Sequence, residues 1–190
     1  MSNSKNDISK FKEGDETVFY TLVGELKQQV FNTCFGFVRN TQEAEDLTQD
    51  TFIKAFQNRD KFKGDSTLKT WIFRIAVNTS LGYLRSKNRD KRKWFSNALS
   101  LDDVQEKMNS IDYPDKTLEE KELEATLNAA LNLLPENQKS VFVMSKIDGY
   151  SNKEISEILS LSISSIESLA HRAKKNLQKI LEKFYKKHYK

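Results

Sequence analysis

The side chains best suited to hold a ligand lie on one face of a segment rich in aromatic and basic residues. Arg74, Asn78 and Arg85 recur at near-fourfold spacing, which places them on one side of a helix, with Lys69 and Phe73 beside them. An aromatic ring can stack on an unpaired base, which contributes roughly 1–3 kcal/mol, and amide or guanidinium groups can bind its exposed edges. The pattern therefore predicts binding of unstacked nucleic-acid bases.

The aromatic residues of this segment have a second explanation, because aromatic side chains in a helix usually belong to the core. Trp71 and Phe73 would then both be buried, and we expect this at least in part for Trp71. Arg74 and Asn78 stay functional candidates under either interpretation. The predicted buried stripe of this helix consists of Leu68, Trp71, Ile72, Ile75, Thr79 and Tyr83.

Groups that catalyse reactions or bind metals form no pattern in the sequence. Cys34 is the single cysteine, which excludes a disulfide framework, a thiolate zinc site and an iron–sulfur cluster. His171 and His188 lack metal-ligand spacing. No phosphate-binding glycine loop or nucleophile–base pair occurs, and the spacing of the carboxylates does not support a helical nuclease. We therefore expect no enzyme, no cofactor, no metal and no small-molecule substrate.

Charge is distributed unevenly along the chain. The net charge is only +4, but residues 85–93 and 171–190 are strongly basic, whereas residues 101–124 are acidic. Two basic regions separated by an acidic stretch predict two contacts with a polyanion.

The composition favours long helices in a soluble protein. With two prolines and six glycines in 190 residues, few positions suit tight turns, and 31% of the residues are charged. No apolar run is long enough to span a membrane, and the polar first residues do not resemble a signal peptide. We therefore expect a cytoplasmic protein without direct membrane insertion, and a disordered segment over residues 1–12.

Residues 43–56 form a predicted helix with two different faces. One face is apolar and belongs to the core. The other carries Asp46, Gln49, Asp50, Ile53 and Gln57. This face is either a solvated acidic surface or a docking surface, since an exposed apolar residue surrounded by carboxylates suits a basic partner.

Three motifs occur together in order: residues 44–52, then residues 62–64, then residues 70–78. They resemble region 2 of bacterial RNA polymerase sigma factors, most closely the extracytoplasmic-function (ECF) group of the sigma-70 family. The resemblance implies that core RNA polymerase docks on the acidic helix. The residues implied in docking are Asp46, Gln49, Asp50 and Ile53.

The resemblance also implies two promoter contacts in this region. In ECF sigma factors, the loop that matches residues 62–67 forms a pocket for one base flipped out of the minus-ten element. The residues implied in handling the melted strand are Phe62, Lys63, Gly64, Asp65, Ser66, Thr67, Arg74 and Asn78, and those implied in holding the DNA backbone are Arg85, Lys87, Arg89 and Arg92. A purely structural role for the loop is the alternative, with Gly64 in a turn and Asp65 or Ser66 capping the next helix.

The C-terminal part contains two short helical patterns joined by a tight turn. Ser151 and Glu154 form a capping-box pattern before the first, and Ser164 and Glu167 form another before the second. This arrangement predicts a helix-turn-helix or, as the alternative, a generic helical hairpin. Residues 134–155 resemble sigma region 4, whose second helix enters the major groove of the minus-thirty-five element. The candidate DNA contacts are Ser165, Ser168, His171, Arg172, Lys174 and Lys175.

Glu167 departs from the family pattern, which commonly has arginines at the positions of Glu167 and Leu169. Glu167 either closes the capping box, which is the favoured interpretation, or accepts a hydrogen bond from a cytosine amine. In both cases the usual minus-thirty-five preference cannot be carried over.

We therefore predict an all-α protein of two small helical domains joined by a flexible linker, the second a helix-turn-helix (winged-helix-like) domain. The expected boundaries are a tail over residues 1–14, region 2 over 15–92, a linker over 93–117 and region 4 over 118–190.

The predicted function is a transcription initiation factor that binds core RNA polymerase, directs it to promoters and assists strand opening. The expected partners are core polymerase, promoter DNA (duplex and melted non-template strand) and an anti-sigma factor, with the protein at the nucleoid or held at the inner membrane by that factor. A free-standing helix-turn-helix regulator is the alternative.

Overall fold

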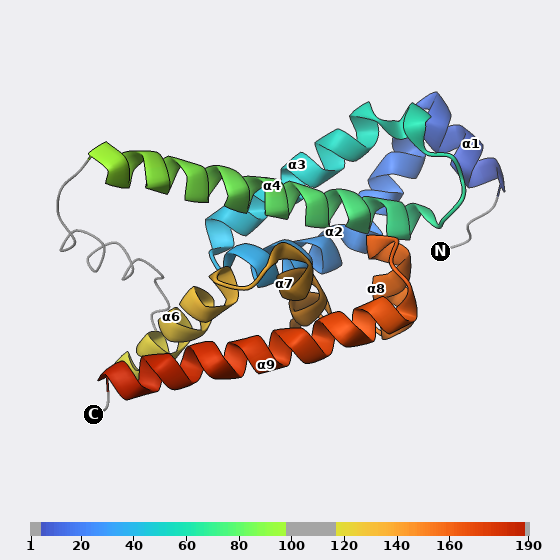
Figure 1. Ribbon diagram of the computed structural model, residues 1–190. Helices are drawn as coiled ribbons and strands as arrows, with labels where there is room; N and C mark the ends of the chain where they lie inside the picture. The colour runs from blue at the N-terminus through green and yellow to red at the C-terminus, as the bar shows by residue number, and fades with distance from the viewer. Residues whose placement is uncertain (1–4, 98–116, 189–190) are drawn as a thin grey trace.

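The computed structural model describes residues 5–97 and 117–188, and Figure 1 shows that every regular element in this part of the chain is a helix. No strand occurs in the described residues, so the predicted helix-turn-helix domain contains only helices in that part of the chain. This confirms the predicted all-α fold. None of the described helices is long and apolar enough to cross a membrane.

The N-terminal half is built on three long helices that pack against one another: α2 (Glu16–Val38), α3 (Thr41–Gln57) and α4 (Leu68–Asn97). A short 3-10 turn, η1 (Arg59–Lys61), follows α3. Asp15 caps α2 by accepting hydrogen bonds from the backbone N–H groups of Thr17 and Val18, which confirms its predicted role. The sole cysteine, Cys34, is buried in α2, and burial raises the pKa of its thiol, as expected of an unreactive core residue.

The prediction of disorder at the N-terminus is wrong for the residues that the structure describes, because α1 (Lys5–Glu13) precedes α2. The side chain of Phe11 is only 1% exposed. Its ring lies 6.5 Å from that of Phe19 and 6.0 Å from that of Trp71. Phe11, with the partly buried Ile8, therefore anchors this otherwise polar helix to the core.

The C-terminal half consists of α6 (Leu118–Asn132), α7 (Glu136–Phe142), a π-helical turn η3 (Val143–Ile147), α8 (Asn152–Leu159) and α9 (Ile163–His188). The capping box of Ser151 and Glu154 is present, as predicted. In Figure 1, α4 and α9 run along opposite sides of the molecule.

One apolar core continues through both halves. The ring of Phe73 on α4 packs edge-on against Tyr150, which precedes α8, with the ring centroids 5.5 Å apart. On α2, Gly36 lies so close to η3 that a Cβ atom at this position would be 2.6 Å from Cγ1 of Val143. A smaller cluster, formed by Ala130, Leu131, Leu134, Ala173 and Leu177, holds α6 and α9 together.

The expected domain boundaries can be compared with the helices only in part. Helix α4 continues past residue 92 to Asn97, and Thr117 is already the N-cap of α6. Most of the predicted linker, residues 98–116, lies outside the described residues.

Candidate nucleic-acid interface

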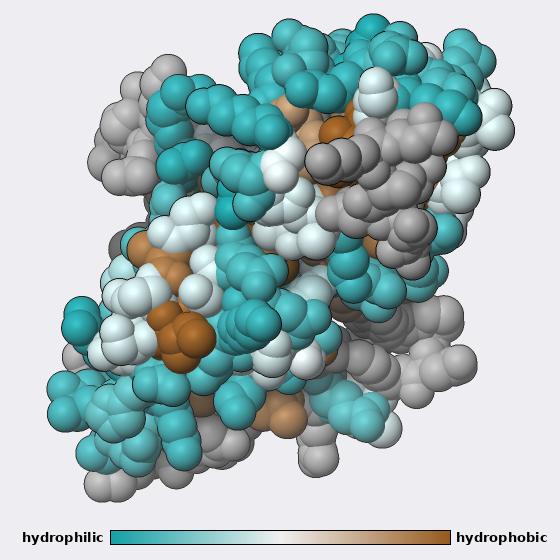
Figure 2. All heavy atoms as spheres, turned by 90° about the vertical axis from the view of Figure 1, so that its right-hand side faces the viewer, coloured by the Kyte–Doolittle hydropathy of each residue, from teal (hydrophilic) through white to brown (hydrophobic). Residues whose placement is uncertain are grey.

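The acidic face of α3 is exposed as predicted. Asp46, Gln49 and Asp50 point to solvent, and Ile53 is 53% exposed. The face in Figure 2, which is on the right in Figure 1, is mostly hydrophilic with small separate hydrophobic spots. The large apolar side chains that are exposed in the described residues belong to different helices: Tyr20, Ile53, Leu123, Leu133, Ile147 and Ile163.

An open groove of about 670 Å³ lies between α3 and α4. Asn78 lines this groove, together with Asp50 from the acidic face and the half-buried Trp71. The structure therefore brings a candidate for strand handling next to a candidate for polymerase docking. None of the side chains of residues 62–67 lines the groove. The complete lining is Leu47, Asp50, Lys54, Asn58, Lys61, Trp71, Ile75, Asn78, Thr79, Gly82, Tyr83 and Ser86.

Sequence reasoning missed two cations and one aromatic residue of this groove. Lys54 and Lys61 come from the end of α3 and from η1, and Tyr83 comes from α4. Lys54 donates a hydrogen bond from Nζ to Oγ1 of Thr79 at 3.3 Å. Its spacing of four residues from Asp50 places Lys54 beside that residue on the helix surface, which was the signal available in the sequence.

The loop over residues 62–67 has the expected turn at Gly64 but a different helix cap from the one expected. Thr67 caps α4, because its hydroxyl accepts a hydrogen bond from the backbone N–H of Thr70 at 3.0 Å. Capping by Asp65 or Ser66 is therefore a wrong prediction. Gly64 has a φ of 80°, the left-handed conformation that glycine adopts without strain. Phe62 is 1% exposed and packs against Trp71, so it anchors the loop, whereas Lys63, Gly64 and Asp65 are exposed.

The guanidinium group of Arg74 is hydrogen-bonded to the C-terminal half of the protein. Its Nε and Nη2 groups donate hydrogen bonds of 3.2 and 2.7 Å to the backbone carbonyl oxygen of Glu157, near the end of α8. Phe73, expected beside the base-binding face, is fully buried against Tyr150. In this arrangement Asn78, rather than Arg74 or Phe73, is the exposed polar candidate on this part of α4.

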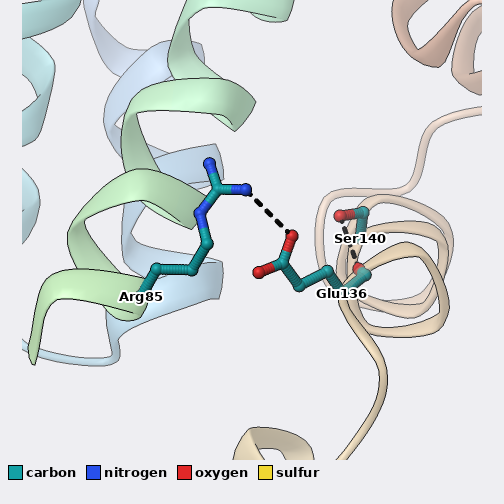
Figure 3. A network of polar contacts seen from close by, with 3 residues as sticks. All are labelled: Arg85, Glu136 and Ser140. Atoms are coloured by element: carbon teal, nitrogen blue, oxygen red, sulfur yellow. Dashed lines mark hydrogen bonds and ion pairs between the residues drawn. The ribbon is translucent and has the colours of Figure 1, made fainter. Parts of the chain in front are cut away.

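Two of the residues expected to hold the DNA backbone are paired with carboxylates. Arg85 donates a hydrogen bond to Oε2 of Glu136 on α7 at 3.3 Å, as Figure 3 shows, and Ser140 donates to the backbone carbonyl of Glu136. Lys87 forms an ion pair with Glu43 on α3. Surface ion pairs contribute about 0–1 kcal/mol, so phosphate groups can displace these carboxylates. Arg89 is exposed, and the side chain of Arg92 lies outside the described residues.

The candidate reading helix α9 begins at Ile163, which is earlier than the predicted cap. The hydroxyl of Ser162 accepts a hydrogen bond from the backbone N–H of Ser165 at 3.2 Å. The capping box of Ser164 and Glu167 is therefore a wrong prediction. Ser165 is half-buried, with its hydroxyl bonded to that of Ser162. The other candidates are exposed on α9: Ser168, His171, Arg172, Lys174 and Lys175.

Asp148 is a partly buried carboxyl at the contact between the two halves. Its Oδ1 lies 3.3 Å from the position that a Cβ on Gly36 would take, and neither of its carboxylate oxygens has a hydrogen-bond partner of good geometry. Burial raises the pKa of Asp148 to about 6, although the Thr33 hydroxyl and the charge of Arg39 lower it in part.

This pKa predicts how stability depends on pH. The folded protein binds the proton of Asp148 more tightly than the unfolded chain does. The protonated carboxyl therefore contributes fully to the free energy of unfolding below about pH 4, and this contribution is lost as the pH rises through about 6. Replacing Asp148 by Asn removes the titration, so the urea midpoint should fall less between pH 4.5 and 7 than in the wild type. Asp60→Asn, at an exposed position, is the control. An equal fall in wild type and D148N would contradict the assignment.

The fold and the helix-turn-helix define an all-helical DNA-binding protein, and comparison with known proteins gives its family. Residues 22–90 match the Sigma-70 region 2 family, and residues 125–177 match the Sigma-70 region 4 family. The chain is 31% identical over 182 residues to the ECF RNA polymerase sigma factor SigW of Bacillus subtilis, covering 93% of this chain and 96% of the relative. It is 27% identical over 184 residues to the RNA polymerase sigma-H factor of Pseudomonas aeruginosa, covering 92% of each chain.

Two solved structures share the fold. CnrH in complex with the cytosolic domain of CnrY has a TM-score of 0.62 at 23% identity, covering 95% of this chain and 98% of CnrH. The sigma factor RpoE of Bartonella quintana, in complex with the anti-sigma factor NepR, has a TM-score of 0.59 at 24% identity, covering 86% and 96%. The chain belongs to the ECF sigma factors of the sigma-70 family. It is a transcription initiation factor and not an enzyme, and a free-standing regulator is not favoured.

Proposed function

We propose that this sigma factor docks on the polymerase through α3, handles the melted minus-ten strand along α4 and reads the minus-thirty-five element with α9. The observation that carries the proposal is the presence of three exposed surfaces of different chemistry, the first two of which meet at Asp50. The α3 surface is acidic and includes the exposed Ile53, and the α3–α4 groove is aromatic and amide-lined. The exposed side of α9 is polar in its first two turns, with Glu167 as the charged residue, and becomes basic from Arg172 onward.

The flipped base of the melted strand is proposed to enter the α3–α4 groove beside the exposed loop at residues 63–65. Trp71 and Tyr83 offer aromatic surface, Asn78 offers both a donor and an acceptor, and Lys54 and Lys61 offer charge for the phosphates. Flipping costs a few kcal/mol of unstacking, which stacking and edge hydrogen bonds in the groove can offset.

The partners and cellular location follow the same proposal. RpoE of Bartonella quintana binds the anti-sigma factor NepR, and CnrH binds the cytosolic domain of CnrY. We propose an anti-sigma factor for this chain as well, which would place the protein either on the nucleoid or at the inner membrane. The test is to purify this protein from cells before and after envelope stress and to identify the proteins that co-purify with it. An anti-sigma partner should be present before the stress and absent after it.

Core polymerase binding and promoter opening can be tested together. The purified protein should co-elute with bacterial core RNA polymerase, and the complex should open a promoter selected from random duplexes. Binding of promoter DNA at high affinity without polymerase would contradict the proposal and favour a free-standing regulator.

Replacing Asn78 by Ala should reduce open-complex formation about tenfold while leaving polymerase affinity unchanged. The side chain is exposed in the groove, so its loss removes a contact to the base and no core packing. Permanganate reactivity of unpaired thymines reports opening, and co-elution reports polymerase binding. Gln29→Ala, which removes an exposed amide from α2, is the matched control. Equal losses in opening and polymerase binding would instead assign Asn78 a structural role.

A further inference from the structure

Glu167 has no structural task in α9. Helix capping is provided by Ser162, whose hydroxyl accepts the N–H of Ser165. Glu167 is exposed, and its carboxylate has no hydrogen bond or ion pair with the residues that the structure describes. Its negative charge is therefore available to a partner outside the chain.

The position of Glu167 on α9 points it away from the core. Ile166, Ala173 and Leu177 are buried on the inner side of the helix. At 100° per residue, Glu167 stands next to Ser164 and His171 on the opposite, exposed side. Because the N-terminal turns of a recognition helix are the part that contacts base edges, Glu167 is placed among the residues nearest the bases.

The charge of Glu167 restricts what it can contact on DNA. The exposed charged residues that follow it on α9 are mostly cations, including Arg172, Lys174 and Lys175, which suit phosphate groups. A carboxylate is repelled by phosphates, so its favourable contact in the major groove is an amino group on a base edge. In the major groove, cytosine presents only its N4 amine, and adenine presents its N6 amine next to the acceptor N7. Guanine and thymine present acceptor oxygens there.

We propose that Glu167 is a specificity residue that accepts a hydrogen bond from the N4 amine of one cytosine in the distal promoter element. The carboxylate rejects guanine and thymine at this position by repulsion from O6 and O4. This inference rests on the proposed function, since it requires α9 to lie in the major groove.

The test uses the sigma factor bound to core polymerase. Duplexes selected from a random library define the distal element, and competition among the four base pairs at each of its positions measures preference. The wild type should prefer cytosine at one position about tenfold, the size of a single base contact. Glu167→Ala should lose the preference at that position alone, and Glu167→Gln should shift it toward adenine, which glutamine binds through N6 and N7.

Lys175→Ala is the matched comparison on the same helix. It should weaken binding to all sequences alike and reduce the salt dependence, as expected for a phosphate contact. Unchanged base preferences at every position in both Glu167 variants would overturn the role of Glu167. Failure of the wild type to select any distal element would instead overturn the proposed function of α9.

Discussion

Reversing the charge of Asp50 by mutation to lysine should abolish co-elution of this sigma factor with core RNA polymerase. Asp50 is exposed on α3, within one turn of Ile53, which is 53% exposed. An apolar side chain flanked by carboxylates fits a basic docking surface, and a lysine would oppose that surface with a like charge costing several kcal/mol. We therefore expect the affinity to fall by at least a hundredfold.

The variant should fold normally, because Asp50 is not part of the buried stripe of α3. The matched control is Asp60→Lys, which makes the same change in charge at an exposed position of η1, outside the acidic face. Circular dichroism should show equal helix content in both variants. Wild-type co-elution of D50K would contradict docking through α3, whereas loss of co-elution in both variants would indicate a non-specific charge effect.

Features determined by nearby residues could be predicted from the sequence. Asp15 and Ser151 cap their helices as expected, because a capping side chain bonds a backbone N–H two or three residues away. The start of α9 was missed because Ser162, Ser164 and Ser165 can all act as caps, and only the folded backbone selects Ser162.

Features determined by distant residues could not be predicted. The helix α1 depends on Phe11 reaching Trp71, sixty residues later in the chain. The burial of Phe73 depends on Tyr150 in the other half, and helical periodicity contains no information about such a contact. The groove at Asn78 likewise requires α3 to lie beside α4, so the only sequence signal for its lysines was the spacing of Lys54 from Asp50 along α3.

The contact between the halves also bears on promoter binding. The minus-ten and minus-thirty-five elements are about 25 base pairs apart, roughly 85 Å along B-form DNA. While Glu157 of α8 binds Arg74, α8 packs against both α4 and α9, and the candidate readers at residues 165–175 span only about 15 Å of α9. If α4 and α9 bind these two elements as proposed, we expect that both can be bound together only after this contact opens.

Two glycines of α2 provide a matched test of this contact. A Cβ at Gly24 would meet nothing within 4 Å, whereas a Cβ at Gly36 would lie 2.6 Å from Cγ1 of Val143. Alanine is favoured over glycine in a helix by about 1 kcal/mol, so Gly24→Ala should raise the free energy of unfolding by that amount. Gly36→Ala gains the same propensity but overpacks the contact at a cost of about 1–3 kcal/mol or more.

Both variants gain the same helix propensity, so Gly36→Ala should be less stable than Gly24→Ala by the overpacking cost of about 1–3 kcal/mol, seen as a melting temperature several degrees lower. Removing the obstructing methyl groups with Val143→Ala should be less harmful in the Gly36→Ala background than in the wild type, because the new Cβ fills the space they leave. Promoter binding by the polymerase complex should not weaken in Gly36→Ala, since the contact has to open there. If Gly36→Ala were as stabilising as Gly24→Ala, then the two halves would not be packed together in solution, and Arg74 would be available to DNA without any opening step.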